Sequence, residues 1–532
     1  MASVLQSLTG NLTNFNNINY KDQNIYNFDT ISTLIIDQLK SLSWWKLLIT
    51  LISILLVWDQ ISYQLNKGSI EGPTYKIWPI IGPFLDSLDP KFSGYKAKWD
   101  SGPLSCVSIF HKFVVIASDR DLSRKIFQSP KYVKPCVVDV AKKILRPENW
   151  VFLDGKEHVD YRKGLNGLFT KQALNNYVPA QEKVMDKYLS KFQEISKDGP
   201  IIFFHELREI MCGLSLRAFC GDYITEEQVK KIADDYYLVT AALELVNFPI
   251  IIPYTKTWYG QRTADMAMKT FAACSAKAKI RVANGGEPTC VLDAWIKAMY
   301  DSKAQFEANP GSKLGVRMFS DKEISEAIFT FLFASQDASS SLACWLFQIV
   351  SDRPDVAQKI REEQLNVRNG DPTIPLTGDL IDKMTYTNMV VKETLRYRPP
   401  VIMVPYVAKQ SFPITENYNA PKGSMIIPSV YPSLHDPEAY ENPDEFIPER
   451  WVEGSQANEN KKNWLVFGTG PHVCLGQTYV MMTFTALIGK ALLYNDLIHK
   501  ITPLSEEIKV FATIFPQDDL ILQFKPRDPL SV

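Results

Sequence analysis

Residues 467–476, Phe-Gly-Thr-Gly-Pro-His-Val-Cys-Leu-Gly, are the stretch on which the prediction of the fold depends. They carry a single thiol, Cys474, and the apolar pattern from Tyr479 to Leu493 follows them. This spacing predicts a loop that leads into a helix. A cysteine just before a helix N-terminus meets the positive end of the helix dipole and unpaired backbone N–H groups, which lower its pKa and favour the thiolate. Cys474 is therefore a candidate iron ligand.

The glycines of this loop favour a close approach to a flat ligand. Gly468, Gly470 and Gly476 have no Cβ, so the backbone is free to adopt positive φ and to lie against a macrocycle. His472 stands two residues before the sulfur and is placed to reach a carboxylate at the rim of such a ligand. The alternative is that Cys474 is an ordinary buried cysteine, since free cysteines usually are buried.

The order of residues in the loop resembles the haem-binding signature of the cytochrome P-450 superfamily, which has Arg, or sometimes His, at the position of His472. The resemblance implies a haem-thiolate fold in which Cys474 is the axial ligand of the iron of haem b, with O2 as cosubstrate. It also implies haem contacts from Phe467, Gly468 and Gly476. Electron donation from a thiolate favours O–O cleavage and hydrogen abstraction from unactivated carbon.

Composition limits the remaining classes of function. The chain has 532 residues, 46% hydrophobic and 12% aromatic, enough for a large core. The net charge of −1 gives no general attraction for nucleic acid, so no such partner is expected. The eight cysteines lack regular spacing, which indicates a reducing compartment rather than a disulfide framework. We find no Walker loop or dinucleotide-binding glycine pattern, so electrons must come from another protein.

The N-terminal part predicts a membrane anchor. Residues 1–41 are expected to form a polar tail with the sequon Asn11-Leu12-Thr13. Residues 42–62 are largely apolar and flanked by tryptophans, which predicts one transmembrane helix at the short limit of the about 17–25 residues that a span needs. A buried amphipathic helix is the alternative. Residues 63–83 form a predicted Pro/Gly hinge, and residues 84–532 the catalytic domain.

Charge around the apolar segment predicts its orientation. Lysines are frequent after the segment, whereas the tail before it carries aspartates. By the positive-inside rule the tail is lumenal and the large domain cytosolic. The lysines in question are Lys67, Lys76, Lys91, Lys96 and Lys98.

The catalytic domain is predicted to be mainly α with small β-sheets. Alternation over 104–118 predicts a β-hairpin, and a helix over 119–128 follows. Mobile polar loops are expected at about 300–320 and 453–462. Helical spacing is found over 157–170, 172–196, 203–220, 225–245, 256–283, 321–351, 354–368 and 387–397.

The longest helical pattern, Asp321 to Val350, has an unusual polar cluster in its middle. Ala334 and Ala338 are i and i+4 and share one face, which suits the approach of a flat cofactor. The cluster resembles the oxygen-activation motif of the superfamily, with Asp337 as its acid, a serine at the glycine position and Ala338 at the threonine position. Asp337 and Ser339, with water, are the predicted proton relay. Alternatively, the serines 339–341 only bond to carbonyls one turn earlier.

Three further residues resemble the Glu, Arg, Arg triad of the superfamily. Glu393 and Arg396 are i and i+3 on one helix, and Arg450 follows in Pro448-Glu449-Arg450-Trp451. Alone, such an i, i+3 pair is weak information, because most are exposed pairs worth about 0–1 kcal/mol. The resemblance implies a structural triad, and if the triad is buried, removing one member should cost about 3–5 kcal/mol and the haem as well.

Two groups of residues are candidates for contacts to the haem rim and to substrate. His472, Arg162 and Lys163 are candidate partners of the propionates. His158, where the superfamily commonly has Trp, is a candidate haem contact or a core residue. Apolar segments predict pocket walls, although each is also compatible with ordinary core. The pocket candidates are Phe248, Val404, Thr513 and Ile514.

Longer stretches are similar to the fungal sterol C-22 desaturases, notably Asn149 to Thr170, Ala241 to Gly260, Phe329 to Val350 and Asn463 to Met482. The similarity spans about Lys40 to Pro529 and includes the departure at Ala338. It implies an enzyme of the endoplasmic reticulum membrane that introduces the C22–C23 double bond into an ergosterol precursor of the ergosta-5,7,24(28)-trienol type. Electrons would come from NADPH through NADPH-cytochrome P-450 reductase.

The residues leave other functions open. The first alternative is a sterol hydroxylase or demethylase with the same haem site. A second is a reductase-independent isomerase or dehydratase, motivated by Ala338. A haem carrier without enzymatic activity is a third.

Overall fold

The computed structural model describes residues 44–76, 78, 80–83, 90–109, 112–136, 139–242, 250–309, 315–511 and 513–531. The chain divides into two compact units, Met1–Tyr63 and Gln64–Val532. The predicted polar tail and the sequon at Asn11 lie outside the described residues.

Helix α3, Trp44–Lys67, corresponds to the predicted anchor. It has a mean hydropathy of 1.5 over its most apolar 18-residue window, none of which is buried, and it is long and apolar enough to cross a membrane. Its apolar side chains, such as Leu51, Ile54 and Leu55, are exposed. The helix extends to Lys67, so the segment predicted as a hinge becomes non-helical only after that residue.

The largest sheet of the second unit has five strands in the order β1-β2-β8-β5-β3. The predicted hairpin is confirmed, since β1 and β2 pair antiparallel from Leu104↔Ala117 to Ile109↔Lys112. Strand β8 pairs parallel with β2 and antiparallel with β5. The five strands are β1 Leu104–Ile109, β2 Lys112–Ala117, β3 Val133–Pro135, β5 Tyr406–Ala408 and β8 Met425–Pro428.

Three smaller sheets complete the β-structure of the described residues. Strands β4 and β9 flank β12, β6 pairs with β7, and β10 pairs with β11. Their bounds are β4 Ile201–Ile202, β6 Phe412–Thr415, β7 Tyr418–Ala420, β9 Asn495–His499, β10 Ile508–Phe511, β11 Thr513–Pro516 and β12 Ile521–Pro526.

Helices form most of the second unit, so the prediction of a mainly α fold with small sheets is confirmed. Each predicted helical range coincides with one or two helices. These are α5 Arg120–Phe127, α7 Gly155–Asn166, α8 Lys171–Asn175, α9 Val178–Ile195, α10 Phe204–Cys220, α11 Glu226–Ala242, α12 Lys256–Ala283, α14 Asp321–Asp352, α15 Pro354–Val367 and α17 Thr385–Tyr397.

Both predicted polar loops are partly wrong. Helix α13, Val291–Ala308, continues well into the first of them, because Trp295, Ile296 and Met299 give it a buried apolar face. A short helix, α19 Gln456–Glu459, lies inside the second. Other helices without a sequence prediction are α4 Phe92–Asp100, α6 Asp139–Leu145, α16 Gly378–Asp382 and α18 Val430–Leu434.

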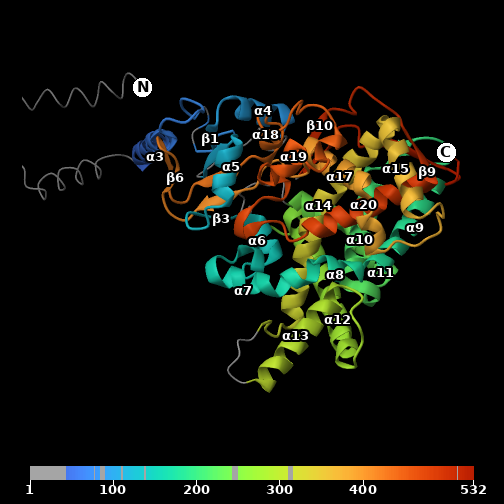
Figure 1. Ribbon diagram of the computed structural model, residues 1–532. Helices are drawn as coiled ribbons and strands as arrows, with labels where there is room; N and C mark the ends of the chain where they lie inside the picture. Colours follow the sequence, from blue (N-terminus) through green and yellow to red (C-terminus); the bar gives the residue numbers. More distant parts are fainter. Residues whose placement is uncertain are drawn as a thin grey trace, which may run out of the picture. The chain divides into compact units, whose positions relative to one another are not determined.

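Helix α14 runs through the middle of the second unit, with α10 and α20 (Gln477–Tyr494) beside it (Figure 1). A capping box starts it, since the Ser320 hydroxyl accepts from the Glu323 N–H and the Glu323 carboxylate accepts from the Ser320 N–H. Most of the helix is buried in the main hydrophobic core. Strand β11 attaches to it, because the Ile514 carbonyl accepts from the Trp345 Nε1 at 3.1 Å and from the Ser341 hydroxyl.

Candidate active site

The cysteine loop folds as a tight turn that ends at the predicted helix. The Cys474 N–H donates to the Phe467 carbonyl at 2.9 Å, and the Val473 N–H donates to the Gly470 carbonyl at 3.1 Å. Helix α20 begins three residues after the cysteine. The sequence therefore predicts both the loop and the helix that follows it.

Two of the three glycines are required by the backbone. Gly468 has φ 67° and Gly470 has φ 80°, a region that disfavours other residues. A Cβ on Gly470 would also lie 2.6 Å from the Phe127 carbonyl oxygen. Gly476 has φ −90°, so the expectation of positive φ is wrong for this residue.

Cys474 is the exposed cysteine of the chain, whereas the other seven are buried or half-buried. Although its side chain keeps accessible surface, the surrounding protein desolvates the thiol and raises its pKa. The backbone N–H groups of Gly476 and Gln477 and the charge of Arg162 oppose this shift. The predicted N–H donors are thus present, but the expected net lowering of the pKa is not found.

The structure brings three predicted residues together beside this loop. The ring centroids of His158 and His472 are 4.0 Å apart, and Trp150 stacks on His158 with 6.5 Å between centroids. Arg162, one turn after His158 on α7, donates to the carbonyl of Val473. Helix α7 therefore contacts the cysteine loop in two ways, through a pair of imidazole rings and through the Arg162 guanidinium.

Arg162 supplies the positive charge here. Burial, together with the neighbouring His158 and the cations Arg162 and Lys409, lowers the pKa of His472 to about 4, so this ring adds no second positive charge at neutral pH. Burial also lowers the pKa of His158. Lys163 is not part of this group, since its side chain is 63% exposed and lies 3.9 Å from Asp160.

The middle of α14 exposes one narrow face. Ala334 is exposed and Ala338 is half-buried, whereas Leu332, Gln336 and Ser340 are buried. The accessible pair is the i, i+4 pair predicted to face a flat cofactor. The contact with a cofactor stays a prediction.

Asp337 is buried, as expected for an acid in dry surroundings, but it points toward α10 and α11. Its Oδ1 lies 2.6 Å from Nη1 of Arg208, and its Oδ2 accepts from the Thr240 hydroxyl at 3.0 Å. Ser339 is also buried. The structure thus places the predicted acid in an ion pair, and its role in proton transfer remains a prediction.

The serines after Asp337 behave differently from one another. The Ser340 hydroxyl bonds to the Gln336 carbonyl one turn earlier at 2.6 Å, as in the alternative interpretation. The Ser341 hydroxyl instead donates to Ile514 of β11. Back-bonding within the helix therefore accounts for only part of this cluster.

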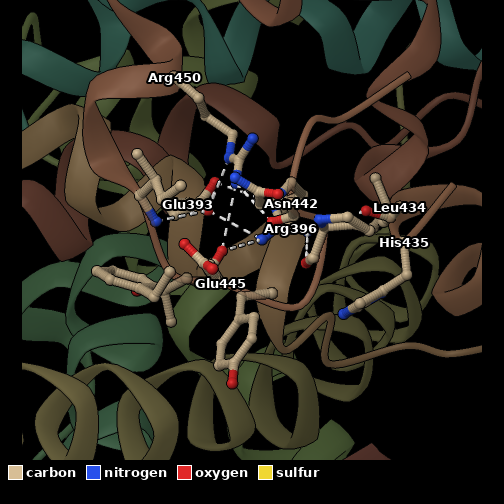
Figure 2. Close-up of polar contacts among 12 residues, drawn as sticks. Glu393, Arg396, Leu434, His435, Asn442, Glu445 and Arg450 are labelled. Carbon is tan, nitrogen blue, oxygen red and sulfur yellow. Dashed lines mark hydrogen bonds and ion pairs between the residues drawn. The ribbon is translucent and has the colours of Figure 1, made fainter. Parts of the chain in front are cut away.

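The predicted triad forms a buried ionic network (Figure 2). Arg396 contacts both carboxylate oxygens of Glu393 at 2.9 and 3.0 Å, and Arg450 Nε donates to Glu393 Oε1 at 2.9 Å. The Trp451 indole and the Ile447 N–H also donate to this carboxylate. Glu393 and Arg396 have side-chain exposures of 0%.

The remaining donors of the triad satisfy backbone carbonyls. Arg396 donates to the carbonyls of Leu434, Pro443 and Glu445, and Arg450 to those of Glu441, Asn442 and Glu445. Figure 2 shows how the two guanidinium groups approach the carboxylate from different segments. The triad therefore joins α17 to the chain between Leu434 and Trp451.

The predicted pocket residues occupy different environments. Val404 is half-buried. Thr513 is buried and donates to the main-chain carbonyl of Asp337 at 3.2 Å. Ile514 is fully buried in a hydrophobic cluster with Trp345 and Ile349. Phe248 lies outside the described residues. A contact of any of them with substrate stays a prediction.

Sequence reasoning missed the residues that surround the predicted ones. Arg208 and Thr240 bind Asp337, and Trp150 stacks on His158. A buried arginine inside the apolar pattern of α10 was an available signal for Arg208, because such a residue needs an anionic partner. Nothing in the sequence distinguishes Thr240 from other helical threonines.

Comparison with known proteins identifies the class. Residues 73–513 match the family model described as Cytochrome P450. The chain therefore belongs to the cytochrome P450 family, whose members are haem-thiolate oxidoreductases that use O2 and electrons supplied by a reductase.

Individual relatives give a narrower similarity. The chain is 68% identical to the C-22 sterol desaturase ERG5 of Saccharomyces cerevisiae, over 100% of this chain and 99% of that protein. It is also 68% identical to the C-22 sterol desaturase ERG5 of Candida albicans, over 91% and 93% of the two chains. The cytochrome P450 monooxygenase oblE of Emericella variicolor is 53% identical over 90% and 93%.

A solved structure supports the fold. The retinoic acid-bound cyanobacterial CYP120A1 superposes with a TM-score of 0.72, covering 85% of this chain and 98% of that chain. The sequence identity is 20%, so this likeness concerns the fold alone.

The residues present fit a haem-thiolate site. Cys474 is accessible and receives backbone N–H donors, Arg162 supplies a cation beside it, and Ala334 and Ala338 leave one face of α14 uncovered. Cys474 would hold the iron, and Arg162 with His158 and His472 would contact the rim. When bound, a thiolate-ligated haem reduces O2 and supplies the oxidant that removes hydrogen from unactivated carbon.

Proposed function

We propose that this protein is a sterol C-22 desaturase that introduces the C22–C23 double bond into the side chain of an ergosterol precursor of the ergosta-5,7,24(28)-trienol type. The observation that carries the proposal is the 68% identity to a C-22 sterol desaturase over the whole chain. The buried triad and the accessible Cys474 support it, because the chain retains the parts that a haem-thiolate enzyme needs.

The proposed reaction balances without hydroxylation. The sterol loses one hydrogen from C22 and one from C23, NADPH supplies two electrons and one hydrogen, and one proton comes from solvent. These four hydrogens reduce O2 to two molecules of water. The cofactor is haem b, and the protein contributes binding, exclusion of water and proton delivery.

Electrons are proposed to come from NADPH-cytochrome P-450 reductase. Lys461 and Lys462 support this proposal, since both are exposed shortly before the cysteine loop. Opposite charges across such a surface accelerate association more than they raise affinity. Charge reversal at both lysines should raise the reductase concentration needed for half-maximal rate, and unchanged kinetics would remove them from the docking surface.

The enzyme is proposed to be a single-pass protein of the endoplasmic reticulum membrane with a cytosolic catalytic domain. The exposed apolar helix α3 supports the anchor, and the lysines that follow it support the orientation. A lumenal tail is part of the same proposal. A glycosidase-sensitive shift of the protein, lost in Asn11→Gln, would support the lumenal location.

A second candidate function is hydroxylation by the same site. It is favoured by one observation, that a relative with 53% identity over 90% of this chain is named a monooxygenase. In this alternative the oxidised carbon keeps an oxygen atom from O2. An isomerase or dehydratase that needs no reductase is the third candidate, because Ala338 stands where the family motif has threonine.

Incubation of the membrane fraction with a C-22 saturated sterol, followed by mass analysis, separates these functions. An NADPH-dependent product two mass units lighter, with a C22–C23 alkene, is expected. An alcohol or a demethylated sterol would favour the second candidate, and conversion without NADPH would favour the third. Membranes that carry the Cys474→Ser variant are the control and should give no product.

A further inference from the structure

Helix α10 packs against both α9 and α11 (Figure 1), and a pocket lies where the three helices meet, the α9–α11 pocket. Its volume is about 360 Å³. Pockets that hold small molecules have about 300–1,000 Å³, so this one admits a compact ligand. None of the residues that line it belongs to the cysteine loop, to α7 or to α14. The pocket is therefore separate from the candidate active site.

Three cationic side chains line the α9–α11 pocket. Lys183 and Lys187 are i and i+4 on α9 and so share one face of the helix, and Arg217 comes from α10. The Arg217 Nη1 donates to the carbonyls of Gly221 and Ile224 at 3.0 and 2.7 Å, and the side chain is only 12% exposed. This guanidinium is thus held in place by the fold, which reduces the entropy that a ligand would have to remove.

One carboxylate occupies part of this cationic surface. Glu226, the first residue of α11, pairs with both Lys187 and Arg217. The hydrogen bond from Lys187, together with the contact to Arg217, holds the pKa of Glu226 below its ordinary value, so this side chain is ionised at neutral pH. An anion that enters the pocket therefore competes with Glu226 for two cations.

Positive charge remains after this pairing. Lys183 forms no ion pair within the part of the chain that the structure describes. The second carboxylate of the pocket, Asp222, lies 3.9 Å from Nη1 of Arg217, and its side chain is fully exposed to water, which screens its charge. The pocket therefore favours an anionic ligand.

The wall also has an apolar part, formed by Ala180 and Val184 of α9 and Val229 of α11. We propose that the α9–α11 pocket binds a small organic phosphate, whose phosphate group contacts the three cations and whose apolar part lies against these three side chains. A guanidinium fork with two ammonium groups suits a dianion better than a singly charged carboxylate. The volume is too small for a lipid with two acyl chains, so the ligand is a soluble ester. The proposal is independent of the sterol reaction, and either can fail without the other.

The test titrates the full-length holoenzyme with phenyl phosphate in a calorimeter. Saturable binding with a Kd of about 1 mM or below is expected. The affinity should fall as salt is added, because salt screens exposed charges. Benzoate, with one negative charge, should bind about threefold more weakly or less tightly still. Saturable binding that is absent, or tighter for benzoate, overturns the proposal.

A saturating sterol distinguishes this pocket from the haem site. Phenyl phosphate should bind with the same affinity in its presence and should leave the Soret band unchanged. Displacement of phenyl phosphate by the sterol would mean that the probe binds at the haem site, and it would overturn the proposal.

Charge-matched variants test the residues of the pocket. Arg217→Gln should weaken binding about tenfold or more, because it removes a charged hydrogen-bond donor, and Lys183→Gln about threefold. Lys230→Gln, on α11 outside the pocket, is their control and should keep the affinity. Glu226→Gln should instead tighten binding about threefold to tenfold, since the competing carboxylate is gone. The neighbouring Glu227→Gln removes the same charge outside the pocket and should not.

The paired variants also define the contrary result. Equal effects of Glu226→Gln and Glu227→Gln, or of Lys183→Gln and Lys230→Gln, would mean that phenyl phosphate responds only to the overall charge of the protein, which overturns the proposal. If Arg217→Gln does not fold, Lys183→Gln and Glu226→Gln decide, because both side chains are exposed.

Discussion

The proposed chemistry depends on Cys474. The environment of this residue explains why its sulfur would become a thiolate when a metal ion binds. Burial raises the pKa of the thiol, whereas Arg162 and two backbone N–H groups lower it. A metal ion bound to the sulfur displaces the proton outright. The loop therefore supplies geometry and partial charge, and the iron would complete the thiolate.

Replacing Cys474 by serine should abolish the thiolate-type Soret band after reduction and addition of carbon monoxide, and with it all sterol conversion. The reason is that a serine hydroxyl does not provide the soft anionic ligand that this iron chemistry requires. The half-buried Cys136 gives the matched control, since Cys136→Ser should keep both the band and the activity. A Cys474→Ser variant with the parental spectrum would show that Cys474 is not the iron ligand.

His435 gives a residue-scale prediction about acid stability. Its pKa is lowered to about 3, first by burial and then by the charges of Arg396 and Arg398, and its ring stacks on Tyr431 with 4.1 Å between centroids. Between pH about 3 and the ordinary histidine value of about 6.5, the unfolded state binds a proton that the folded state does not. The free energy of unfolding should therefore fall as pH drops through this window.

Thermal unfolding between pH 4 and 7 checks this prediction. His435→Phe keeps an aromatic ring and removes the titrating group, so its melting temperature should depend less on pH over the same window. A parallel decline in the two proteins would show that other groups cause the acid sensitivity.

At the scale of elements, one carboxylate joins α17 to the chain around Arg450. Glu393 accepts from two arginines, an indole and a backbone N–H, so it is a fully satisfied buried anion. Removing one member of such a network leaves the remaining buried charges with too few partners. Their number makes this junction sensitive to single substitutions.

Arg396→Ala should lower the free energy of unfolding by about 3–5 kcal/mol and release the haem, because the buried Glu393 carboxylate loses one of its two cationic partners and three backbone carbonyls lose their donor. Denaturant unfolding and the Soret band measure the two effects. Lys230→Ala is the control, since Lys230 and Asp234 form an exposed i, i+4 pair that contributes about 0.3–0.5 kcal/mol. Comparable losses in the two variants would contradict a special role for the triad.

The elements also show where sequence reasoning succeeds. The patterns of α12 and α14 and the hairpin β1–β2 follow from local periodicity, and the structure confirms them. Helix α13 was partly predicted as a loop, because polar residues on its exposed face obscure the buried positions. The short strands β3 to β12 were not predicted, since their pairing joins distant segments that no local pattern encodes.

The candidate site divides in the same way. The signature loop and the triad were predicted from their resemblance to motifs of the superfamily, and so were His158 and Arg162, which stand one helical turn apart. Arg208 and Thr240 depend on the contact of α10 and α11 with α14, which only the tertiary structure provides. Lys163 follows Arg162 directly on α7, yet its side chain is exposed. Which of the two neighbours faces the cysteine loop depends on how α7 is rotated about its axis, and the sequence does not show this.

At the scale of the whole molecule, the division at Tyr63 separates an exposed apolar helix from a unit with its own core. Deleting residues 1–63 should move the protein from the membrane to the soluble fraction in an extraction at low salt, with retention of the Soret band. Replacing Leu51 and Leu55 together by aspartate in the full-length chain is the companion variant and should weaken membrane retention too. Complete membrane retention of the shortened protein would mean that another surface binds lipid.

The bond from Ile514 to α14 bears on how the chain matures. The indole of Trp345 in the central helix is hydrogen-bonded by a strand that is translated 169 residues later. During synthesis α14 is therefore complete long before β11 leaves the ribosome. Until then the Ser341 hydroxyl and the Trp345 indole lack their acceptor, the Ile514 carbonyl. We therefore expect the cofactor to bind only after translation is complete. Chains truncated before β11 should be degraded in the cell, because they lack the strand that bonds to Trp345.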